Sequence, residues 1–159
     1  FYADGTTIDQ MDLNIFYGKT FMCDLRNIAK PGQPIAKEDL ISGGLPSLKD
    51  LRGNRLLLYA DWASTRWTGP NLYKGNMFLS KQTAHWLVDI GIVALAMDFS
   101  VDGHHPYPCH QILLGAGIPL IENLINLDKI ASSEFTMIAL PLKIEQGDGA
   151  PARVLAITD

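Results

Sequence analysis

The spacing of apolar residues predicts four strands in the first three quarters of the chain. From Lys19 to Arg26, apolar residues alternate with polar or small ones, which is the two-residue period of a half-buried strand. The run from Arg55 to Ala60 is almost wholly apolar, as in a strand covered on both faces. Ile92 to Phe99 and Ile118 to about Glu122 indicate two further strands.

Helix signals lie between the later strands. Ser80 is a good N-cap for a helix whose apolar residues share one face, and Gly91 is a good C-terminal stop. A second, shorter helix is expected near residues 109–115, after a proline-rich loop. Strands that alternate with helices predict parallel α/β units.

The C-terminal third has a different pattern. Two strand candidates, Phe135 to Ile144 and Ala152 to Thr158, flank the turn sequence Gly147-Asp148-Gly149, which is typical of a hairpin. The predicted fold class is therefore α/β, with a mixed β-sheet and helices packed on it. Residues 63–78 lack a clear period and are expected to form a long ordered loop.

One domain over residues 1–159 is expected, because neither a repeat nor a low-complexity linker divides the chain. The chain starts with Phe1 and not with methionine, so we expect it to be truncated at its N-terminus. The net charge of −4 is spread over interspersed acidic and basic residues, which disfavours nucleic acid as a partner.

Membrane insertion is also disfavoured, because every apolar run is far shorter than the roughly 20 residues that a spanning helix needs. The two cysteines, Cys23 and Cys109, are too few for a disulfide framework and are expected to be buried free thiols. These features predict a soluble, cytoplasmic protein.

Candidate chemistry lies where the predicted parallel strands end, since ligands of open α/β sheets bind beyond the carboxyl ends of the strands. Asp61, Asp98 and Glu122 occupy such ends. Glu122 leaves an apolar strand, so its carboxylate needs a cation, a set of donors or solvent. His110 starts a short helix whose first turn favours anions, which indicates a neutral imidazole that could bind a metal.

A plainer interpretation also exists for these residues. His110 could be a half-buried, hydrogen-bonded histidine and Glu122 a solvated strand end, and spacing alone favours this interpretation. Asp98, Ser100 and Asp102 are expected to cap the next helix or to brace the turn.

Aromatic residues gather in the loop that follows the second strand. Trp62, Trp67 and Tyr73 would suit a pocket for a flat, partly apolar ligand, although loop packing explains them almost as well. Motifs of serine hydrolases, phosphate-binding loops and dinucleotide-binding folds are missing from the sequence, which disfavours those classes.

Several blocks resemble the Putative cyclase family, which includes bacterial kynurenine formamidases and isatin hydrolase. The resemblance rests on sequence blocks that span nearly the whole chain, namely Asp4-Gly5-Thr6-Thr7, Phe78-Leu79-Ser80, Asp98-Phe99-Ser100-Val101-Asp102, Tyr107-Pro108-Cys109-His110, Ile121-Glu122-Asn123-Leu124, Ala139-Leu140-Pro141-Leu142 and Asp148-Gly149-Ala150-Pro151. It implies a partly barrel-like sheet of the swivelling β/β/α type, and a homo-oligomer.

The resemblance also implies a metal site. In the family, a histidine twelve residues before a glutamate supplies ligands to a divalent metal, zinc or manganese, and His110 and Glu122 match those positions. The other ligands come from a block of the form His-x-Gly-Thr-His-x-Asp-x-Pro-x-His, which this sequence lacks. That block would end just before Phe1, and its last histidine would be the general acid or base.

The implied activity is hydrolysis of the C–N bond of an aryl-formamide or cyclic amide, a small-molecule substrate, by a metal-bound hydroxide. Trp62 and Trp67 would line an aryl pocket, with Asp98 and Ser100 bracing the ligand loop. One departure concerns Asp61, since the family commonly has Arg-Thr-Gly before the tryptophan. Two alternatives remain: a non-catalytic binding or scaffold domain with an incomplete metal site, and a cyclase or dehydratase of a biosynthetic intermediate.

Overall fold

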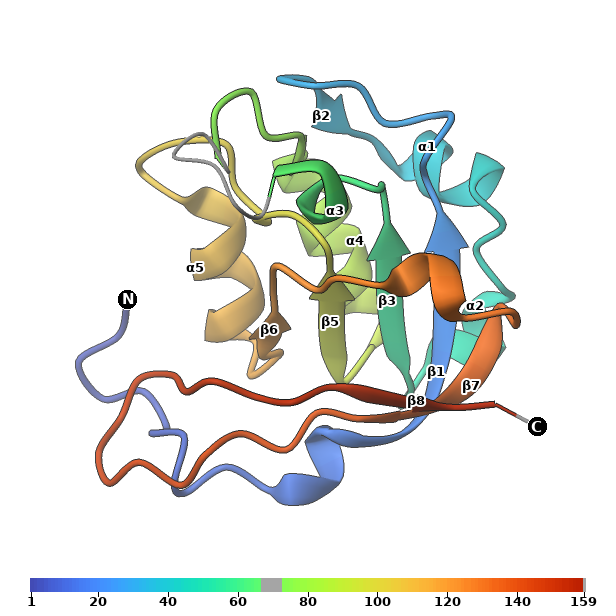
Figure 1. The fold of residues 1–159 in the computed structure, drawn as a ribbon. Coiled ribbons are helices and arrows are strands. Elements are labelled where there is room, and N and C mark those ends of the chain that lie inside the picture. The colour runs from blue at the N-terminus through green and yellow to red at the C-terminus, as the bar shows by residue number, and fades with distance from the viewer. Residues whose placement is uncertain (67–72, 159) are drawn as a thin grey trace.

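The computed structural model describes residues 1–66 and 73–158 and contains a curled, mixed sheet (Figure 1). Six strands form this sheet, in the spatial order β6 (Leu120–Ile121), β5 (Ala94–Met97), β3 (Arg55–Tyr59), β1 (Tyr17–Asp24), β7 (Glu134–Ile138) and β8 (Leu155–Ile157). A smaller sheet pairs β2 (Pro34–Ile35) with β4 (Phe78–Leu79) in parallel.

Strand directions confirm the predicted combination of parallel units and a hairpin. β1, β3, β5 and β6 pair in parallel, as expected for strands joined through helices. β7 runs antiparallel to β1, and β8 runs antiparallel to β7, so the C-terminal third forms the predicted hairpin. The fold class inferred from the sequence is therefore confirmed.

Local signals define the two longest helices, α4 (Lys81–Ile90) and α5 (Pro108–Gly115). The Ser80 hydroxyl accepts a hydrogen bond from the Thr83 amide at 3.1 Å, and Gly91 ends α4 in the left-handed conformation at φ 83°. The remaining helices each span six residues or fewer: α1 (Lys37–Ser42), α2 (Leu48–Leu51), α3 (Ala63–Arg66), and the 3-10 turns η1 (Leu13–Ile15) and η2 (Leu127–Lys129).

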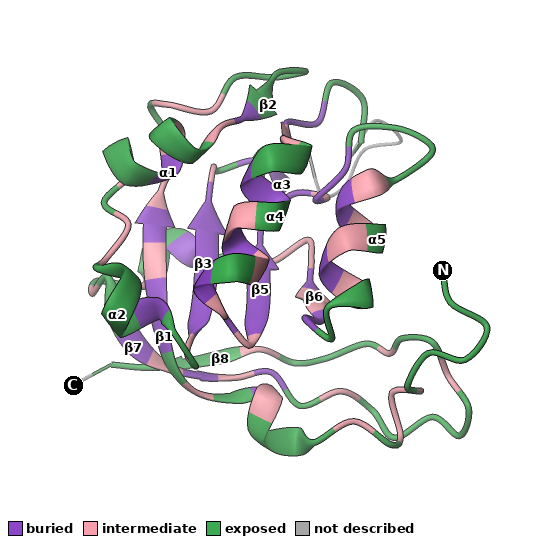
Figure 2. Cartoon of the chain, turned by 180° about the vertical axis from the view of Figure 1, so that it is seen from behind, coloured by how far each residue is buried: buried purple, intermediate pink, exposed green. Residues whose placement is uncertain are grey.

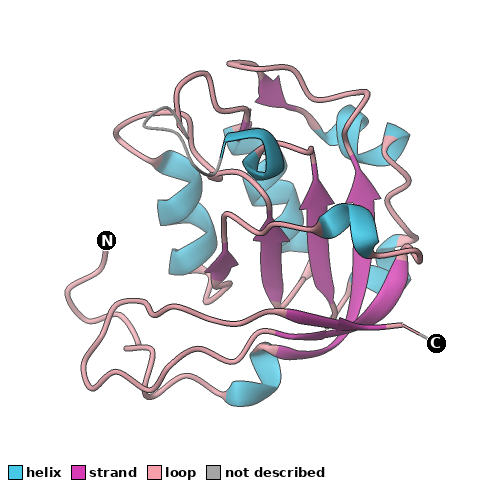
Figure 3. Ribbon diagram, viewed as in Figure 1, coloured by secondary structure: helices cyan, strands magenta, loops and turns pink. Residues whose placement is uncertain are grey.

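Figure 3 shows that these helices are distributed around the sheet, and Figure 2 shows that the central strands are buried. Successive residues of β3 enter two different apolar clusters. Leu56 and Leu58 belong to the cluster that includes residues of α4 and α5, whereas Leu57 and Tyr59 belong to the cluster formed with η2 and β7. This alternation explains why the run is apolar throughout, because both faces of β3 are covered.

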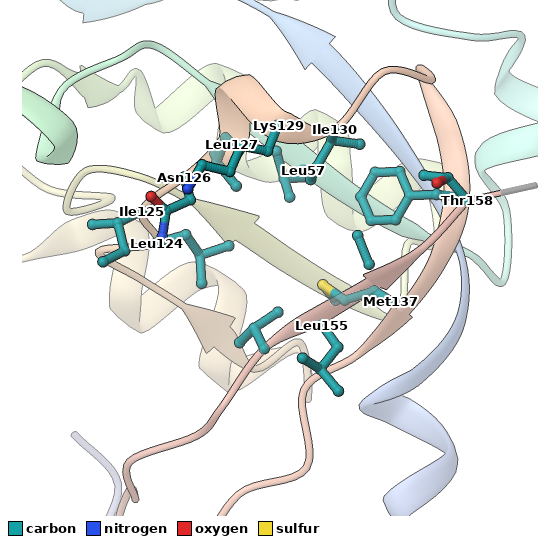
Figure 4. Close-up of a pocket in the computed structure, with 13 residues that line it drawn as sticks. Leu57, Leu124, Ile125, Asn126, Leu127, Lys129, Ile130, Met137, Leu155 and Thr158 are labelled. Carbon is teal, nitrogen blue, oxygen red and sulfur yellow. The ribbon is translucent and has the colours of Figure 1, made fainter.

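Apolar side chains remain exposed in β8 and in the segment that follows β7. They are Leu140, Leu142, Ile144, Leu155 and Ile157. Beside β8, a cavity of about 280 Å³ lies between the β7–β8 hairpin and the segment around η2 (Figure 4). The homo-oligomer expected from the sequence stays a prediction.

The cysteines and the lengths of the helices were both subjects of prediction from the sequence. Cys23 and Cys109 are buried free thiols, as predicted, and burial raises the pKa of each to about 12. Within residues 1–66 and 73–158, none of the helices is long and apolar enough to cross a membrane.

Ser80→Ala should destabilise the protein by about 1 kcal/mol, because the first turn of α4 loses the side-chain acceptor that caps Thr83. Chemical unfolding of the wild type and the variant measures this difference. Ser64→Ala, at an exposed hydroxyl whose partner Asp61 lies in its own turn, serves as a control and should cost less. An equal loss in both variants would contradict the assigned cap.

Candidate functional site

The sequence-predicted ligands lie together at the carboxyl end of the parallel strands. β5 and β6 pair with Leu95 opposite Leu120 and Ala96 opposite Ile121, so both strands end at the same edge. The chain leaves β5 into a loop, residues 98–102, while it leaves β6 at Glu122. Both the loop and Glu122 therefore lie where ligands of open α/β sheets bind.

Glu122 is held by the loop that follows β5. Its Oε1 accepts a hydrogen bond from the Val101 amide at 2.7 Å and a longer one from the Ser100 hydroxyl at 3.4 Å. The side chain is 21% exposed. The carboxylate is thus fixed in position by two neutral donors of the loop.

His110 is held by the last residue of the same loop. Its Nδ1 lies 2.8 Å from Oδ2 of Asp102, and its Nε2 lies 3.7 Å from Oε1 of Glu122. Asp102 also accepts hydrogen bonds from the backbone amides of Cys109 and His110, at 3.0 and 2.9 Å, so it caps the start of α5. The predicted capping role of Asp102 is confirmed.

The charge state of His110 differs from the neutral imidazole that its position in the first turn of a helix favours. Burial lowers the pKa of the ring, but hydrogen bonds and charges from Asp102 and Glu122 outweigh it and raise the pKa to about 9. Two carboxylates at close range favour the imidazolium more than the helix end opposes it. The helix-end argument from the sequence did not include these two carboxylates, which favour the protonated ring.

The donor set nevertheless fits a divalent cation. Zinc binds histidine nitrogen and carboxylate oxygen at roughly 2.0–2.2 Å each, and the 3.7 Å between His110 Nε2 and Glu122 Oε1 is shorter than the sum of two such bonds. A carboxylate on the other ring nitrogen, here Asp102, is the usual partner of a metal-binding histidine. Over residues 1–66 and 73–158, however, three or more such ligands do not converge.

Asp98 binds backbone amides of the segment that follows β3. Its carboxylate accepts hydrogen bonds from the amides of Ala60 and Trp62, at 2.8 and 2.6 Å, and burial raises its pKa despite these bonds. It therefore ties the end of β5 to the segment after β3. The predicted bracing role of Ser100 also agrees with its contact to Glu122.

Of the two predicted pocket tryptophans, the structure describes Trp62. Trp62 is 2% exposed and packs in the apolar cluster of α4 and α5, and its role toward a substrate stays a prediction. Trp67 lies outside the described residues. The cavity of Figure 4 is lined by other residues, among them Leu57, Leu127 and Met137.

Sequence reasoning missed three contributors to the site. It did not anticipate the contact of Asp102 with the His110 ring. It also missed Asn76, whose buried amide donates to the carbonyls of Ser100 and Asp102 and accepts from the Ser100 amide. Phe1 was missed as well, and its ring stacks on His110 with centroids 5.0 Å apart. The contacts of Asn76 and Phe1 join segments distant in sequence, and the contact of Asp102 with His110 spans a loop without a regular pattern, so no local pattern signals them.

Comparison with known protein families identifies the family of this chain. The sequence profile of the family described as "Putative cyclase" matches residues 1–103. The chain belongs to the cyclase family. His110 and Glu122 lie beyond the matched range, so their assignment rests on the geometry and on the relatives that extend further.

Relatives of the cyclase family cover nearly the whole chain. The kynurenine formamidase of Geobacillus thermodenitrificans is 30% identical over 157 residues, which are 96% of this chain and 68% of the relative. The kynurenine formamidase of Delftia acidovorans is 26% identical over the same shares of the two chains. The isatin hydrolase of Roseibium aggregatum is 33% identical over 102 residues, which are 63% of this chain and 37% of the relative.

Solved structures agree with the fold. One described as a potential metal-dependent hydrolase with cyclase activity superposes with a TM-score of 0.79 at 26% identity, covering 98% of this chain and 72% of its own. An isatin hydrolase bound to the product analogue thioisatinate gives a TM-score of 0.78 at 24% identity, covering 98% and 64%. The cyclase-type fold is therefore shown, and the named relatives are hydrolases.

In metal-free protein, the protonated His110 ring should stabilise the fold in a pH-dependent way. An unfolded histidine titrates near roughly pH 6.5, whereas the pKa of the folded ring is about 9. The stabilisation is complete below the pKa of the unfolded histidine, and it is lost as the pH rises through the pKa of the folded ring. The free energy of unfolding of the wild type should therefore approach that of His110→Asn over this range.

Chemical unfolding in the presence of a chelator, repeated across this pH range, measures the difference. His85→Asn, at an exposed position of α4, controls for the loss of a histidine elsewhere. A gap between the wild type and His110→Asn that does not narrow would show that Asp102 and Glu122 do not hold a proton on the ring.

Proposed function

We propose that this chain supplies His110 and Glu122 to the divalent metal site of an amide hydrolase. The observation that carries the proposal is the aligned set Asp102, His110 and Glu122, in which Nε2 of the ring lies 3.7 Å from a carboxylate oxygen and Nδ1 lies against a second carboxylate. This is the arrangement of a histidine ligand with its supporting carboxylate. Relatives named as hydrolases support the reaction class.

Each residue has a distinct part in this proposal. His110 offers a neutral nitrogen donor and Glu122 a negative oxygen donor, while the Val101 amide and the Ser100 hydroxyl hold the carboxylate in place. When bound, a zinc or manganese ion polarises a carbonyl and increases the acidity of water. Neither His110 nor Glu122 is the nucleophile.

The first two residues of the chain pack against α5 beside His110. The Phe1 ring stacks on His110 at an interplanar angle of 20°, and the Tyr2 hydroxyl donates to the Gln111 carbonyl at 2.8 Å. In a longer protein, residues preceding Phe1 would enter beside His110. A histidine-rich block at that place would complete the ligand set.

The proposed substrate class is an aryl-formamide or a cyclic amide. The names of the relatives, kynurenine formamidase and isatin hydrolase, support a substrate with an aromatic ring and a C–N bond to be hydrolysed. Trp62 and Trp67 remain the proposed aromatic lining. Asp61 is exposed and replaces a family glycine, so a substrate with a positive or hydrogen-bond-donating group near the pocket is favoured.

His110→Ala and Glu122→Ala should each weaken divalent metal binding by more than about 100-fold, beyond the roughly 10–100-fold typical for outer partners of a metal site. Titration calorimetry with zinc and with manganese on the full-length protein measures this loss. His85→Ala and Glu134→Ala remove the same residue types at exposed positions of α4 and β7 and should leave the affinity unchanged. Unchanged metal binding in both site variants would overturn the proposal.

The reaction class has its own test. Full-length protein loaded with zinc or manganese should hydrolyse aryl-formamides or cyclic aromatic amides, and Glu122→Ala should lose about 100-fold or more of kcat/KM, because a ligand of the cation is missing. Analysis of the products formed from a panel of these amides measures the loss. Stoichiometric metal with cyclised or dehydrated products would favour the cyclase alternative. Neither metal nor turnover would favour the scaffold alternative.

A further inference from the structure

The carboxylate of Asp102 contacts both the backbone at the start of α5 and the ring of His110. Its oxygens accept three N–H groups, the amides of Cys109 and His110 and the Nδ1 side of the His110 ring, over 2.8 to 3.0 Å. Two of these donors belong to the backbone of α5 and the third to a side chain of the same helix. One carboxylate thus fixes both where α5 begins and how the ring is oriented.

Burial makes this arrangement rigid. Asp102 is 6% exposed, and a carboxylate removed from water requires strong donors in fixed positions. The amides in the first turn of a helix have no partners within the helix, so they supply such donors. Asn76 holds the backbone of the same loop. Its side-chain amide donates to the Ser100 carbonyl at 2.7 Å and to the Asp102 carbonyl at 3.4 Å.

We propose that Asp102 is a positioning residue that selects the His110 tautomer with hydrogen on Nδ1 and directs the Nε2 lone pair toward Glu122. A carboxylate beside one ring nitrogen holds the hydrogen there and leaves the other nitrogen as the acceptor. The free nitrogen then faces Oε1 of Glu122 at 3.7 Å. That this tautomer prepares Nε2 to bind a metal rests on the proposed function. The tautomer itself is a property of the chain without metal.

A plain helix cap makes a different prediction. If Asp102 served only to cap α5, its removal would lower the free energy of unfolding and would leave the ring tautomer unselected in both the wild type and the variant. If it selects the tautomer, the neutral ring of the wild type should carry its hydrogen on Nδ1, and Asp102→Ala should lose that selection. Nitrogen chemical shifts of the imidazole separate the two cases.

The experiment uses full-length, metal-free protein with ¹⁵N-labelled histidine, observed by NMR at a pH above the titration of the ring. The chain has four histidines, so His110→Gln identifies the signals of interest. Wild type and Ser80→Ala, which loses the cap of α4 only, should both show the Nδ1–H tautomer. Asp102→Ala should show a mixture or the opposite tautomer.

The same proteins are then titrated with zinc. Asp102→Ala should bind about 10–100-fold more weakly than the wild type, with Ser80→Ala unchanged, and Asp102→Asn should fall between them because its amide oxygen can still accept from the ring. A wild-type ring with hydrogen on Nε2, or zinc affinity within two-fold of wild type in Asp102→Ala, would overturn the inference. Absence of zinc binding by the wild type would overturn the proposed function instead, with the tautomer still deciding the role of Asp102.

Discussion

Buried carboxylates at the end of β5 need hydrogen-bond donors, and meeting that need organises the site. Asp98 obtains its donors from the amides of Ala60 and Trp62, which ties the end of β5 to the segment after β3. Asp102 obtains its donors from the first turn of α5. Since neither carboxylate could stay buried without these amides, the segment from Asp98 to Asp102 has little freedom to move.

The two candidate ligands are brought together by that restricted loop. Glu122 is the residue next to β6, and the Val101 amide in the middle of the loop binds its carboxylate at 2.7 Å. His110 belongs to α5, and Asp102 at the end of the loop binds its ring. His110 and Glu122, which are twelve residues apart in sequence, are therefore brought together through a third segment.

The parts of the fold that were predictable are those with strong local signals. α4 carries its own cap at Ser80 and its own stop at Gly91, and β3 is apolar because both of its faces are covered. By contrast, α1, α2 and β2 were not predicted, since elements of two to six residues contain too few positions to show a period.

The site was predictable only in part, and for the same physical reason. Position at the end of an apolar strand drew attention to Glu122, but the interpretation of His110 as its partner depended on family resemblance. The contacts that hold them, from Asp102 and Asn76, join residues through the tertiary fold. The start of the helix was visible in the sequence, whereas the two carboxylates that flank the His110 ring and raise its pKa were not.

The location of the two ligands also constrains how a complete site could assemble. His110 lies on α5 and Glu122 directly follows β6, and the buried loop after β5 contacts both side chains. Phe1 and Tyr2, by contrast, reach the site through one ring stack and one hydrogen bond on α5. Because the loop already holds His110 and Glu122 near each other, a cation at this point would meet two ligands whose positions the fold has fixed.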